Sequence, residues 1–413
     1  MKKVLLLVIS SKGSISGVER HLETFLDEIS IMGLGRNFCL IEFTAYDMVS
    51  IHIDNEISEK EYRRIRIPMP RHSSGTGRCN VWKTRFKDVA AHAIKDILKD
   101  FHPEIIHFHT MNLIDLAISL KDIYVGSHIV SHIHCIPWKY AYDTDQNHFN
   151  KLYRLSNDTM PTGNKAKAYI TQECELSSYK FPDYVICVSR AVESFIRSVG
   201  RDDSIGVVEN GINIREDIFK REFSPKTSTD CLFVGSVSKS KGVEYIFAAI
   251  EGLRKESVNI RLHICGKENG LLISELSLAY PNVDFKFWGT LPYKELTKLY
   301  KSCDFGILPS LHEQSSYVAL EMMSWGLPLI SSNVDGLKDM LEDTTDSLVA
   351  NVIFSPILGL RIDTEDLKEK MKLMATDPKL RETISDNAKK KIENRYTARE
   401  MAKRIINIYE TIS

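Results

Sequence analysis

The sequence predicts an α/β protein with two domains, each built around a parallel, doubly wound sheet. Its 413 residues are too many for one average core and suit two domains of about 200 residues each. Short apolar runs alternate with helical patterns in two successive series, which is typical of parallel sheets covered by helices. Residues 207–229, which separate the series, have no apolar periodicity. We expect domains at 1–215 and 216–413, and leave open whether the last helix packs back on the first domain.

The first series predicts buried strands at 3–10, 37–44, 104–110, 128–134 and 184–189. Amphipathic segments at 17–30, 81–101 and 190–200 predict the helices between them. The apolar run at 4–9 follows a charged start, as in a signal peptide, but it is short. No small-residue cleavage site follows it before the next charged residues. We therefore interpret it as a strand.

The second series predicts strands at 231–237, 260–266, 283–289, 305–310 and 328–333. Helices are expected at 242–256, 293–302 and 316–326, and in the C-terminal run from Asp377. Open α/β sheets bind ligands at the carboxyl ends of their strands. The default site of two such domains is therefore a cleft between them.

Composition excludes several classes of protein. A formal net charge of −1 gives no reason to expect nucleic acid as a partner. The 8 cysteines are scattered without a C-x-x-C pair, which favours reduced cytosolic cysteine over disulfides or a zinc site. No segment has the roughly 18 consecutive apolar residues that a spanning helix requires. We expect a soluble cytoplasmic protein, or at most a peripheral one at the inner face of the plasma membrane.

The segment 309–332, PSLHEQSSYVALEMMSWGLPLISS, carries the strongest chemical signal. It places Glu313 in a loop and Glu321 in the helix that follows. If most of this span were helical, the carboxylates would lie roughly 10 Å apart, about the length of a diphosphate with a sugar at each end. The N–H groups at the helix start could seat the diphosphate, and the carboxylates could accept hydrogen bonds from sugar hydroxyls. The alternative is a solvated helix with an incidental pair of glutamates.

This segment resembles the Glu–x7–Glu signature of family 4 (group 1) glycosyltransferases, retaining enzymes with two facing Rossmann-like domains, the GT-B fold. The resemblance covers nearly the whole chain. The further segments that carry it are SGVERHLETF (16–25), PEIIHFHT (103–110), HIVSHIHC (128–135), YVICVSRAV (184–192), VVENGIN (207–213) and FVGSVSKSKGVEYIFAAI (233–250).

The resemblance implies roles for particular residues. Glu313 would face the donor hexose, Glu321 would hold the ribose, and Lys241 would pair with the phosphates. Backbone N–H groups would contact the sugar and diphosphate from Ser316, Tyr317 and Val318, and the distal phosphate from Ser16 and Gly17. His134 would lie beside the reacting sugar, so the expected catalytic residues are Glu313, His134 and Lys241. Gly266 completes the donor side, and His109 belongs to the acceptor side.

One position departs from the family pattern. An arginine usually precedes the lysine by five residues, and here that position is Ser236. Losing one of two cations should weaken stabilisation of the diphosphate leaving group. Lys239 could reach back in its place. Otherwise the helix dipole and the N-terminal loop carry more of the charge.

Histidines and a second acidic motif raise the question of a metal. His107 and His109 alternate on one expected strand, and His132 and His134 on another, so each pair shares a face and could bind zinc. No carboxylate or cysteine completes the set, and the family does not depend on a metal. We therefore favour a satisfied or catalytic histidine role and expect no metal. The Asp-x-Asp at 143–145 follows no apolar strand and is interpreted as a solvated loop.

Residues 62–87 contain eight basic residues and no acidic one. They could form a solvated basic face, or contact an anionic acceptor or an acidic membrane surface through Arg63, Arg64 and Arg66. Trp82 beside them could be an interfacial anchor or a core residue.

The sequence thus predicts a retaining, metal-independent transfer of a hexose from a nucleotide-diphosphate sugar, without a cofactor. The acceptor would be a polysaccharide or lipid-linked glycan. The wording of residues 312–323 resembles a bacterial subgroup encoded near peptide-modification genes, which adds a peptide as a candidate acceptor. The alternatives are a GT-B sugar-nucleotide epimerase, and a non-catalytic protein of the same fold that binds sugar nucleotides or glycans.

Overall fold

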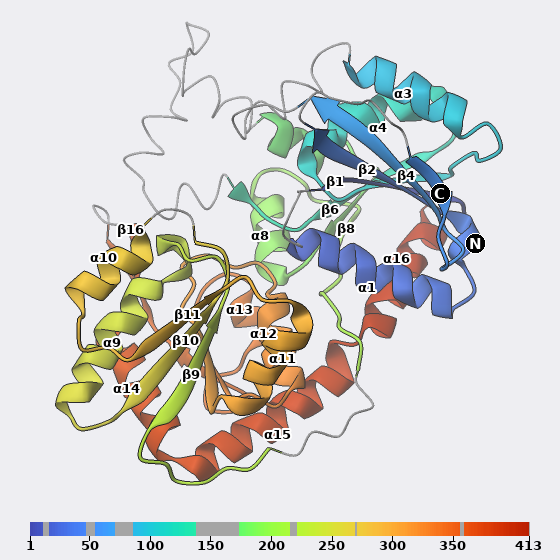
Figure 1. Cartoon of the computed structure of the whole chain (residues 1–413). Coiled ribbons are helices and arrows are strands. Elements are labelled where there is room, and N and C mark those ends of the chain that lie inside the picture. The colour runs from blue at the N-terminus through green and yellow to red at the C-terminus, as the bar shows by residue number, and fades with distance from the viewer. Residues whose placement is uncertain are drawn as a thin grey trace, which may run out of the picture. The chain divides into compact units, whose positions relative to one another are not determined.

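A computed structural model describes residues 1–10, 16–46, 54–70, 86–137, 173–214, 221–268, 271–355 and 359–412. The chain divides into two compact units (Figure 1). In the described part of the chain, the first unit consists of the residues up to Gly211 together with those from Ala398 onward. The second unit runs from Ile212 to Thr397. We call these units the first and second domains.

The first domain contains an 8-stranded sheet in the order β3-β4-β2-β1-β5-β6-β7-β8. Neighbouring strands are parallel except β3 and β4, which are antiparallel. The strands are β1 (Val4–Ser10), β2 (Phe38–Tyr46), β3 (Asp54–Ile57), β4 (Arg63–Pro70), β5 (Ile105–Phe108), β6 (His128–Ile133), β7 (Tyr184–Cys187) and β8 (Ile205–Val207). All five strands predicted for this domain are present.

Helices cover both faces of this sheet because its central strands are apolar on both sides. Alternate residues of β1 point to opposite faces: Leu5 and Leu7 join one core, and Leu6 joins the other. The first core is closed by α3 (Phe86–Ile97) and α4 (Ile114–Ile123). The second is closed by α1 (Gly17–Ile31) and α16 (Ala398–Thr411). Helix α8 (Arg190–Ser198) packs in a smaller core against β7. Helix α16 therefore belongs to the first domain although the whole second domain precedes it in sequence.

The second domain contains a fully parallel 6-stranded sheet in the order β11-β10-β9-β12-β13-β14. Its strands are β9 (Thr229–Val234), β10 (Ile260–Cys265), β11 (Phe285–Gly289), β12 (Phe305–Leu308), β13 (Leu329–Ser332) and β14 (Leu348–Ala350). An antiparallel hairpin follows, formed by β15 (Val352–Ser355) and β16 (Gly359–Ile362).

Helices also cover both faces of the second sheet (Figure 1). One face carries α9 (Val243–Lys255), α10 (Leu272–Ala279) and α14 (Thr364–Thr376). The other carries α11 (Tyr293–Ser302), α12 (Tyr317–Ser324), α13 (Leu337–Met340) and the C-terminal half of α15 (Pro378–Arg395). The prediction of two parallel, doubly wound α/β domains is therefore confirmed. Among the described residues, no helix is both long and apolar enough to cross a membrane.

Candidate active site

The donor-side residues predicted for the second domain lie after three neighbouring strands, β10, β9 and β12. Because the strands are parallel, their carboxyl ends share one edge of the sheet. Loops and helix starts at this edge bring together residues that are far apart in sequence. They are Ser236, Lys239, Lys241, Gly266, Glu313, Ser316, Tyr317, Val318 and Glu321. We call this group the donor-side loops.

Lys241 and Glu313 form an ion pair at the centre of the donor-side loops. The Lys241 Nζ atom lies 2.5 Å from Glu313 Oε2, and the two side chains are 28% and 21% exposed. Lys241 closes a 3₁₀ turn at Lys239–Lys241, and Gly242 follows it with φ of +69°. A Cβ atom at residue 242 would lie 2.0 Å from the carbonyl oxygen of Pro309, so the turn packs directly on the loop that carries Glu313. The close contact requires glycine at 242 on two counts, its positive φ and the lack of space.

The loop that carries Glu313 is held by contacts with the segment after β13. The N–H of Gly336 donates to the carbonyl oxygen of Glu313 at 2.9 Å. A Cβ atom at Gly336 would lie 1.6 Å from the carbonyl oxygen of Gln314. His312 is paired with Asp335, and Gln314 Nε2 bonds to the His312 ring at 2.8 Å. The sequence analysis missed this support because it comes from the segment after β13, which carries no motif of its own.

Glu321 is a buried carboxylate on α12. It is 4% exposed, and its Oε2 atom accepts a hydrogen bond of 2.8 Å from the hydroxyl of Tyr300 on α11, which is fully buried. The helix starts at Tyr317, as predicted, with the Ser316 side chain capping the N–H of Ala319 at 3.2 Å. The estimate of carboxylate separation therefore applies only from Tyr317 onward, because 313–316 precede the helix. Tyr300 was not predicted, since nothing in its own surroundings in the sequence marks it.

Lys239 is the other cation that the sequence predicted for the donor-side loops. Ser236, which replaces the usual arginine, is exposed, and so is Lys239. Gly266 has φ of +146°, and a Cβ atom there would lie 1.7 Å from the carbonyl oxygen of Gly235. The loops after β9 and β10 are thus in backbone contact. Lys241 is the cation that the structure places beside Glu313.

The Ser16 N–H, which was predicted to contact the distal phosphate, has a partner at the start of its own helix. Ser16 and Glu19 form a capping box at the start of α1, in which the Ser16 N–H donates to Glu19 Oε2 at 2.6 Å. This N–H is therefore already bound to a carboxylate, an anion that would repel a phosphate. Gly17 begins the helix, and a Cβ atom there would have no described atom within 4 Å. The residues before Ser16, at 11–15, lie outside the described residues.

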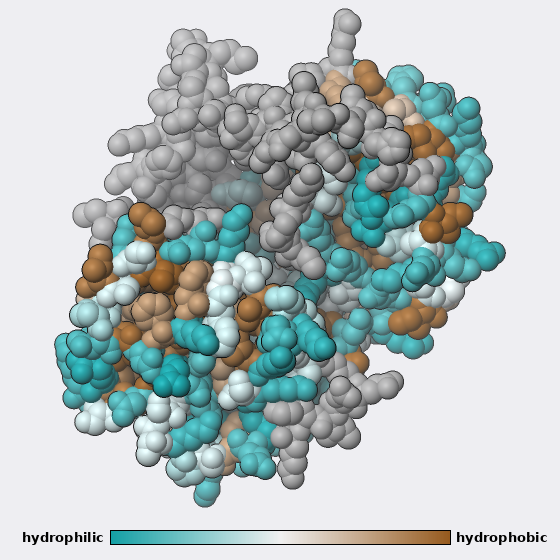
Figure 2. Space-filling model, viewed as in Figure 1, coloured by the Kyte–Doolittle hydropathy of each residue, from teal (hydrophilic) through white to brown (hydrophobic). Residues whose placement is uncertain are grey.

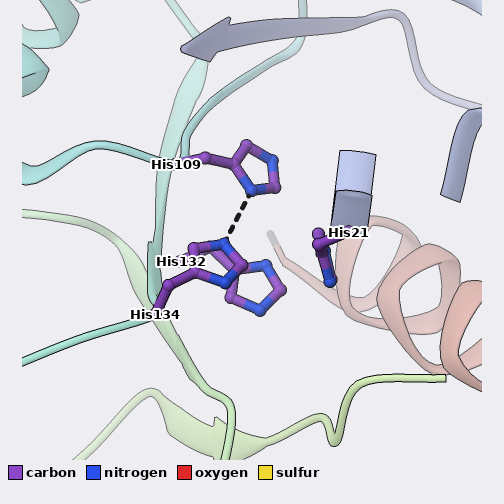
Figure 3. A group of neighbouring side chains, drawn as sticks. All are labelled: His21, His109, His132 and His134. Carbon is purple, nitrogen blue, oxygen red and sulfur yellow. Dashed lines mark hydrogen bonds between the residues drawn. The ribbon is translucent and has the colours of Figure 1, made fainter. Parts of the chain in front are cut away.

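The histidines of the first domain form a tight group (Figure 3). His109 follows β5, His132 lies in β6 and His134 follows β6, while His21 faces them from α1. One ring nitrogen from each lies within 4.8 Å of the others. We call these four residues the histidine cluster. The sequence analysis expected His107 as the fourth member of this group. The structure has His21 there instead. His21 could have been found from segment 16–25, because it lies on the helix face that packs on the sheet.

Partners fix some ring nitrogens of the cluster. His21 Nδ1 bonds to Asn210 Oδ1 at 3.0 Å, and His109 Nδ1 lies 3.1 Å from His134 Nε2. Beside the cluster, His107 Nδ1 bonds to the hydroxyl of Tyr409 on α16 at 2.6 Å.

Other buried ring nitrogens of the cluster have no hydrogen-bond partner among the described residues. They are His21 Nε2, His109 Nε2, and both nitrogens of His132. A buried polar group left unpaired costs about 1–3 kcal/mol. Such a concentration of unpaired nitrogens therefore requires an explanation.

Burial makes the cluster electrically neutral. Loss of hydration lowers the pKa of His21 to about 4, although its bond to Asn210 acts in the opposite direction. Loss of hydration, with repulsion from neighbouring imidazoles, holds the pKa values of His109, His132 and His134 well below their usual range. At neutral pH all four rings are uncharged, which leaves lone pairs free to bind a cation.

The three arginines predicted for the acceptor side are engaged in ion pairs. Arg64 makes two bonds of 2.8 Å to Glu42, and Arg66 lies 3.3 Å from Glu42 and 3.1 Å from Glu56. Arg63 pairs with the Asp100 carboxylate at 3.1 Å. These three arginines therefore do not form an unbalanced positive surface, because two neighbouring strands and the turn after α3 supply the acids. The positions 71–85, with Trp82, and the Asp-x-Asp at 143–145 lie outside the described residues.

Solved structures with this fold are known. The chain is similar to the sucrose-phosphate synthase of Thermosynechococcus elongatus, with a TM-score of 0.73 and 17% identity, covering 99% of this chain and 98% of that one. It is also similar to Anabaena HepE in complex with UDP and glucose, with a TM-score of 0.69 and 14% identity over the full length of both. At these identities the similarity establishes the fold alone, which is the GT-B fold of glycosyltransferases.

Sequence relatives narrow the class. The first domain matches "Glycosyltransferase Family 4" over residues 49–216, and the second matches "Glycosyl transferases group 1" over residues 214–391. The chain therefore belongs to the family 4, group 1 glycosyltransferases. An uncharacterized glycosyltransferase of Methanocaldococcus jannaschii is 29% identical over 244 residues, which are 55% of this chain and 59% of that protein. A glycogen synthase of Mycobacterium tuberculosis is 32% identical over 135 residues, 32% of this chain and 33% of that protein. The first of these matches spans about three fifths of the relative's length, and the second about a third.

Proposed function

We propose that this protein is a retaining hexosyltransferase that uses a nucleotide-diphosphate sugar, and that the donor-side loops bind the donor. The observation that carries the proposal is the Lys241–Glu313 pair, which lies at the carboxyl ends of the strands beside the start of α12. This pair provides one cation for a diphosphate and one carboxylate for sugar hydroxyls. The HepE structures similar to this chain contain UDP, glucose and UDP-glucose, which supports a hexose donor of this class.

In the proposed complex, the donor separates Lys241 from Glu313. Lys241 then pairs with the diphosphate, which carries more charge than one carboxylate, and Glu313 accepts hydrogen bonds from hexose hydroxyls. The start of α12, the positive end of the helix dipole, lies beside the same anion in this complex. Ser236 in place of the usual arginine leaves Lys241 and this helix start to stabilise the leaving group.

Glu321 is proposed to hold the ribose of the nucleotide. Its carboxylate is buried, and Tyr300 already donates to one of its oxygens. That bond fixes the orientation of the carboxylate, which in the proposed complex accepts hydrogen bonds from the ribose hydroxyls. Tyr300 acts here as a positioning residue.

We further propose that the reaction needs no metal at the diphosphate and no protein nucleophile. The bond between the anomeric carbon and the diphosphate oxygen breaks, and the acceptor hydroxyl attacks from the same face. The leaving phosphate takes the acceptor proton. The protein contributes position and charge stabilisation. The proposed acceptor is a polysaccharide or lipid-linked glycan, with a peptide as a further candidate.

A ligand panel tests the donor assignment. Thermal unfolding is measured with UDP, GDP and ADP, and with their glucose and mannose derivatives, for the native protein and for Lys241→Ala. One nucleoside diphosphate should raise the Tm of the native protein by several degrees at about 100 times its Kd. The effect should be lost in Lys241→Ala. If no diphosphate shifts the Tm, or if Lys241→Ala responds equally, the donor site is assigned wrongly.

Donor hydrolysis separates the enzyme from a non-catalytic binding protein of the same fold, which the Ser236 replacement would favour. The protein with the stabilising sugar nucleotide should release free hexose slowly in the absence of acceptor. Binding without any release, even with candidate acceptors present, would favour the non-catalytic alternative.

A further inference from the structure

Among the described residues, the histidine cluster is the group of side chains whose spacing could hold a metal ion, and the proposed reaction does not use it as a whole. Its members come from α1 and from the ends of β5 and β6 (Figure 3). His21, His109 and His132 are at most 3% exposed, and His134 is half-buried. Among the described residues these buried rings have no carboxylate partner, so stabilisation of a protonated imidazole does not explain the arrangement.

The ring nitrogens already have a spacing that suits a metal ion. Bonds of about 2.0–2.1 Å from zinc to nitrogen place two tetrahedral ligands roughly 3.3 Å apart. His109 Nδ1 and His134 Nε2 lie 3.1 Å apart, and all four ligand atoms lie within 4.8 Å of one another. Small ring rotations would bring the remaining nitrogens to ligand distance.

Hydrogen bonding outside the cluster prepares His21 for the same role. Its Nδ1 atom bonds to the Asn210 carbonyl oxygen, which requires the proton on Nδ1 and leaves a lone pair on Nε2. That Nε2 atom is one of the unpaired nitrogens of the cluster. Histidines that bind metals commonly donate their second N–H to an oxygen in this way, which fixes the tautomer. Both nitrogens of His132 are also unpaired, so either could serve as a ligand.

We propose that the histidine cluster binds one transition-metal ion of the zinc or cobalt type, which cross-links α1 to the ends of β5 and β6. Imidazole selects such ions over magnesium and calcium, which require oxygen ligands. The ion provides partners for nitrogens that otherwise have none. This reverses the expectation from the sequence that no metal is bound. It does not depend on the proposed function, because it is argued from residues of the first domain alone.

The test uses the full chain, purified through a tag without histidine. After chelation and dialysis, the protein is reloaded with Zn²⁺ or Co²⁺, and bound metal is measured by mass spectrometry. We expect about one ion per chain, a rise in Tm of about 5 °C or more, and the visible absorption of tetrahedral Co²⁺. Fewer than about 0.2 ions per chain with no shift in Tm would overturn the proposal and indicate a site filled by water.

Two variants separate the cluster from adventitious binding. His21→Gln and His132→Gln should each reduce bound Co²⁺ at least tenfold and remove its tetrahedral absorption. The matched control is His128→Gln, which lies on the same strand as His132 but at its opposite end, and should bind as the native protein does. Equal metal content in all four proteins would mean an adventitious ion only. If neither cluster variant folds, the stoichiometry and spectrum of the native protein still decide.

His134 separates this inference from the proposed function. If His134 is a metal ligand, His134→Ala loses the tetrahedral Co²⁺ spectrum, and the inference stands whatever happens to turnover. If His134 contacts only the sugar, the variant keeps the spectrum and loses turnover, and the inference is then wrong for this residue.

Discussion

The two domains treat polar groups at the ends of their strands in opposite ways. In the second domain, Lys241 and Glu313 are charged, partly exposed and paired with each other. In the first domain, the histidine cluster is neutral and buried, and several of its nitrogens have no partner among the described residues. A half-exposed ion pair can exchange partners at little cost, because water and ligand replace the lost contacts. Unpaired buried nitrogens can gain a partner only from an ion or molecule that enters the site. The ion pair of the second domain therefore suits a substrate, and the histidine cluster of the first domain suits a resident ion or water.

The largest effect should come from breaking the charged pair. Glu313→Gln keeps the shape of the side chain but removes its charge, so turnover should fall by roughly 10³-fold, as for the loss of other groups that stabilise a transition state. The Tm should stay within about 2 °C, because the residue lies in a partly exposed loop. Steady-state kinetics and thermal unfolding provide both values.

Glu295→Gln on the exposed side of α11 is the matched control for this prediction and should keep native turnover. Turnover of Glu313→Gln within a few-fold of native would remove Glu313 from the proposed reaction.

Acid should destabilise the first domain before the second. Burial lowers the folded pKa of His21 to about 4, against about 6.5 in the unfolded chain. Below pH 6.5 the unfolded state therefore binds more protons, and stability is lost as pH falls from about 6.5 to about 4. For His21 alone the loss is about 3 kcal/mol. Hydrogen exchange of the metal-free protein at pH 7, 6 and 5 should show β5 and β6 opening more at low pH.

The matched comparison for the acid experiment is β9 and β12, whose exchange should change less over the same range. Equal acid sensitivity in the two sheets would mean that the histidines are not the cause.

Arg64 tests whether the basic strand β4 serves stability or the acceptor. Arg64→Ser leaves the mostly buried Glu42 with the longer contact to Arg66 as its one ion pair among the described residues. We expect a loss of about 1–2 kcal/mol in the free energy of unfolding, measured by urea titration. Donor hydrolysis and the Michaelis constant for acceptor should be unchanged in the folded protein. Arg36→Ser, in an exposed pair with Glu61, should have no measurable effect on stability. A raised Michaelis constant for acceptor without loss of stability would restore the acceptor role.

Tyr300→Phe probes the orientation of Glu321. Removing one hydroxyl should raise the KM for donor about tenfold while kcat changes little, because ribose binding is present in both ground and transition states. Isothermal titration with the nucleoside diphosphate should show the same loss, while a nucleobase analogue without ribose should bind equally to both proteins. Unchanged affinity for the nucleoside diphosphate would contradict the positioning role.

The smallest expected effect is that of added magnesium. In the proposed complex Lys241 and the start of α12 take the role that a divalent ion has in other transferases, so Mg²⁺ or Mn²⁺ should change turnover less than twofold. The assay uses buffers freed of metals by a chelating resin. A strict requirement for either ion would contradict the proposal that no metal stabilises the diphosphate.

The sequence predicted strands and motifs that lie within one short segment. It missed features that depend on contacts between residues far apart in the chain. Strands such as β1 and β12 are buried on both faces, so each is a continuous apolar run that is visible without a structure. Strand β4 was missed because its arginines drew attention to charge, although Ile65 and Ile67 alternate with them and point into the core. The apolar residues recur at every second position, as in a strand, but the charged residues between them concealed this pattern.

The candidate sites divide in the same way. Glu313, Glu321 and Ser316 lie within one contiguous segment, so one motif identified all three. Tyr300 comes from another helix, and Asn210 approaches His21 from 189 residues away. Only the packed fold brings such residues together, and a single sequence contains no signal for the contact.

Helix α16 has a consequence for how the protein is made. Its residues close the core of the first domain against α1, and its Tyr409 binds His107 beside the histidine cluster. A ribosome releases this helix only after the entire second domain has been synthesised. Until then part of the apolar core of the first domain is exposed, whereas the second domain can complete its fold as soon as it has been synthesised. During that interval His107, whose ring stacks on that of His132, also lacks its partner Tyr409.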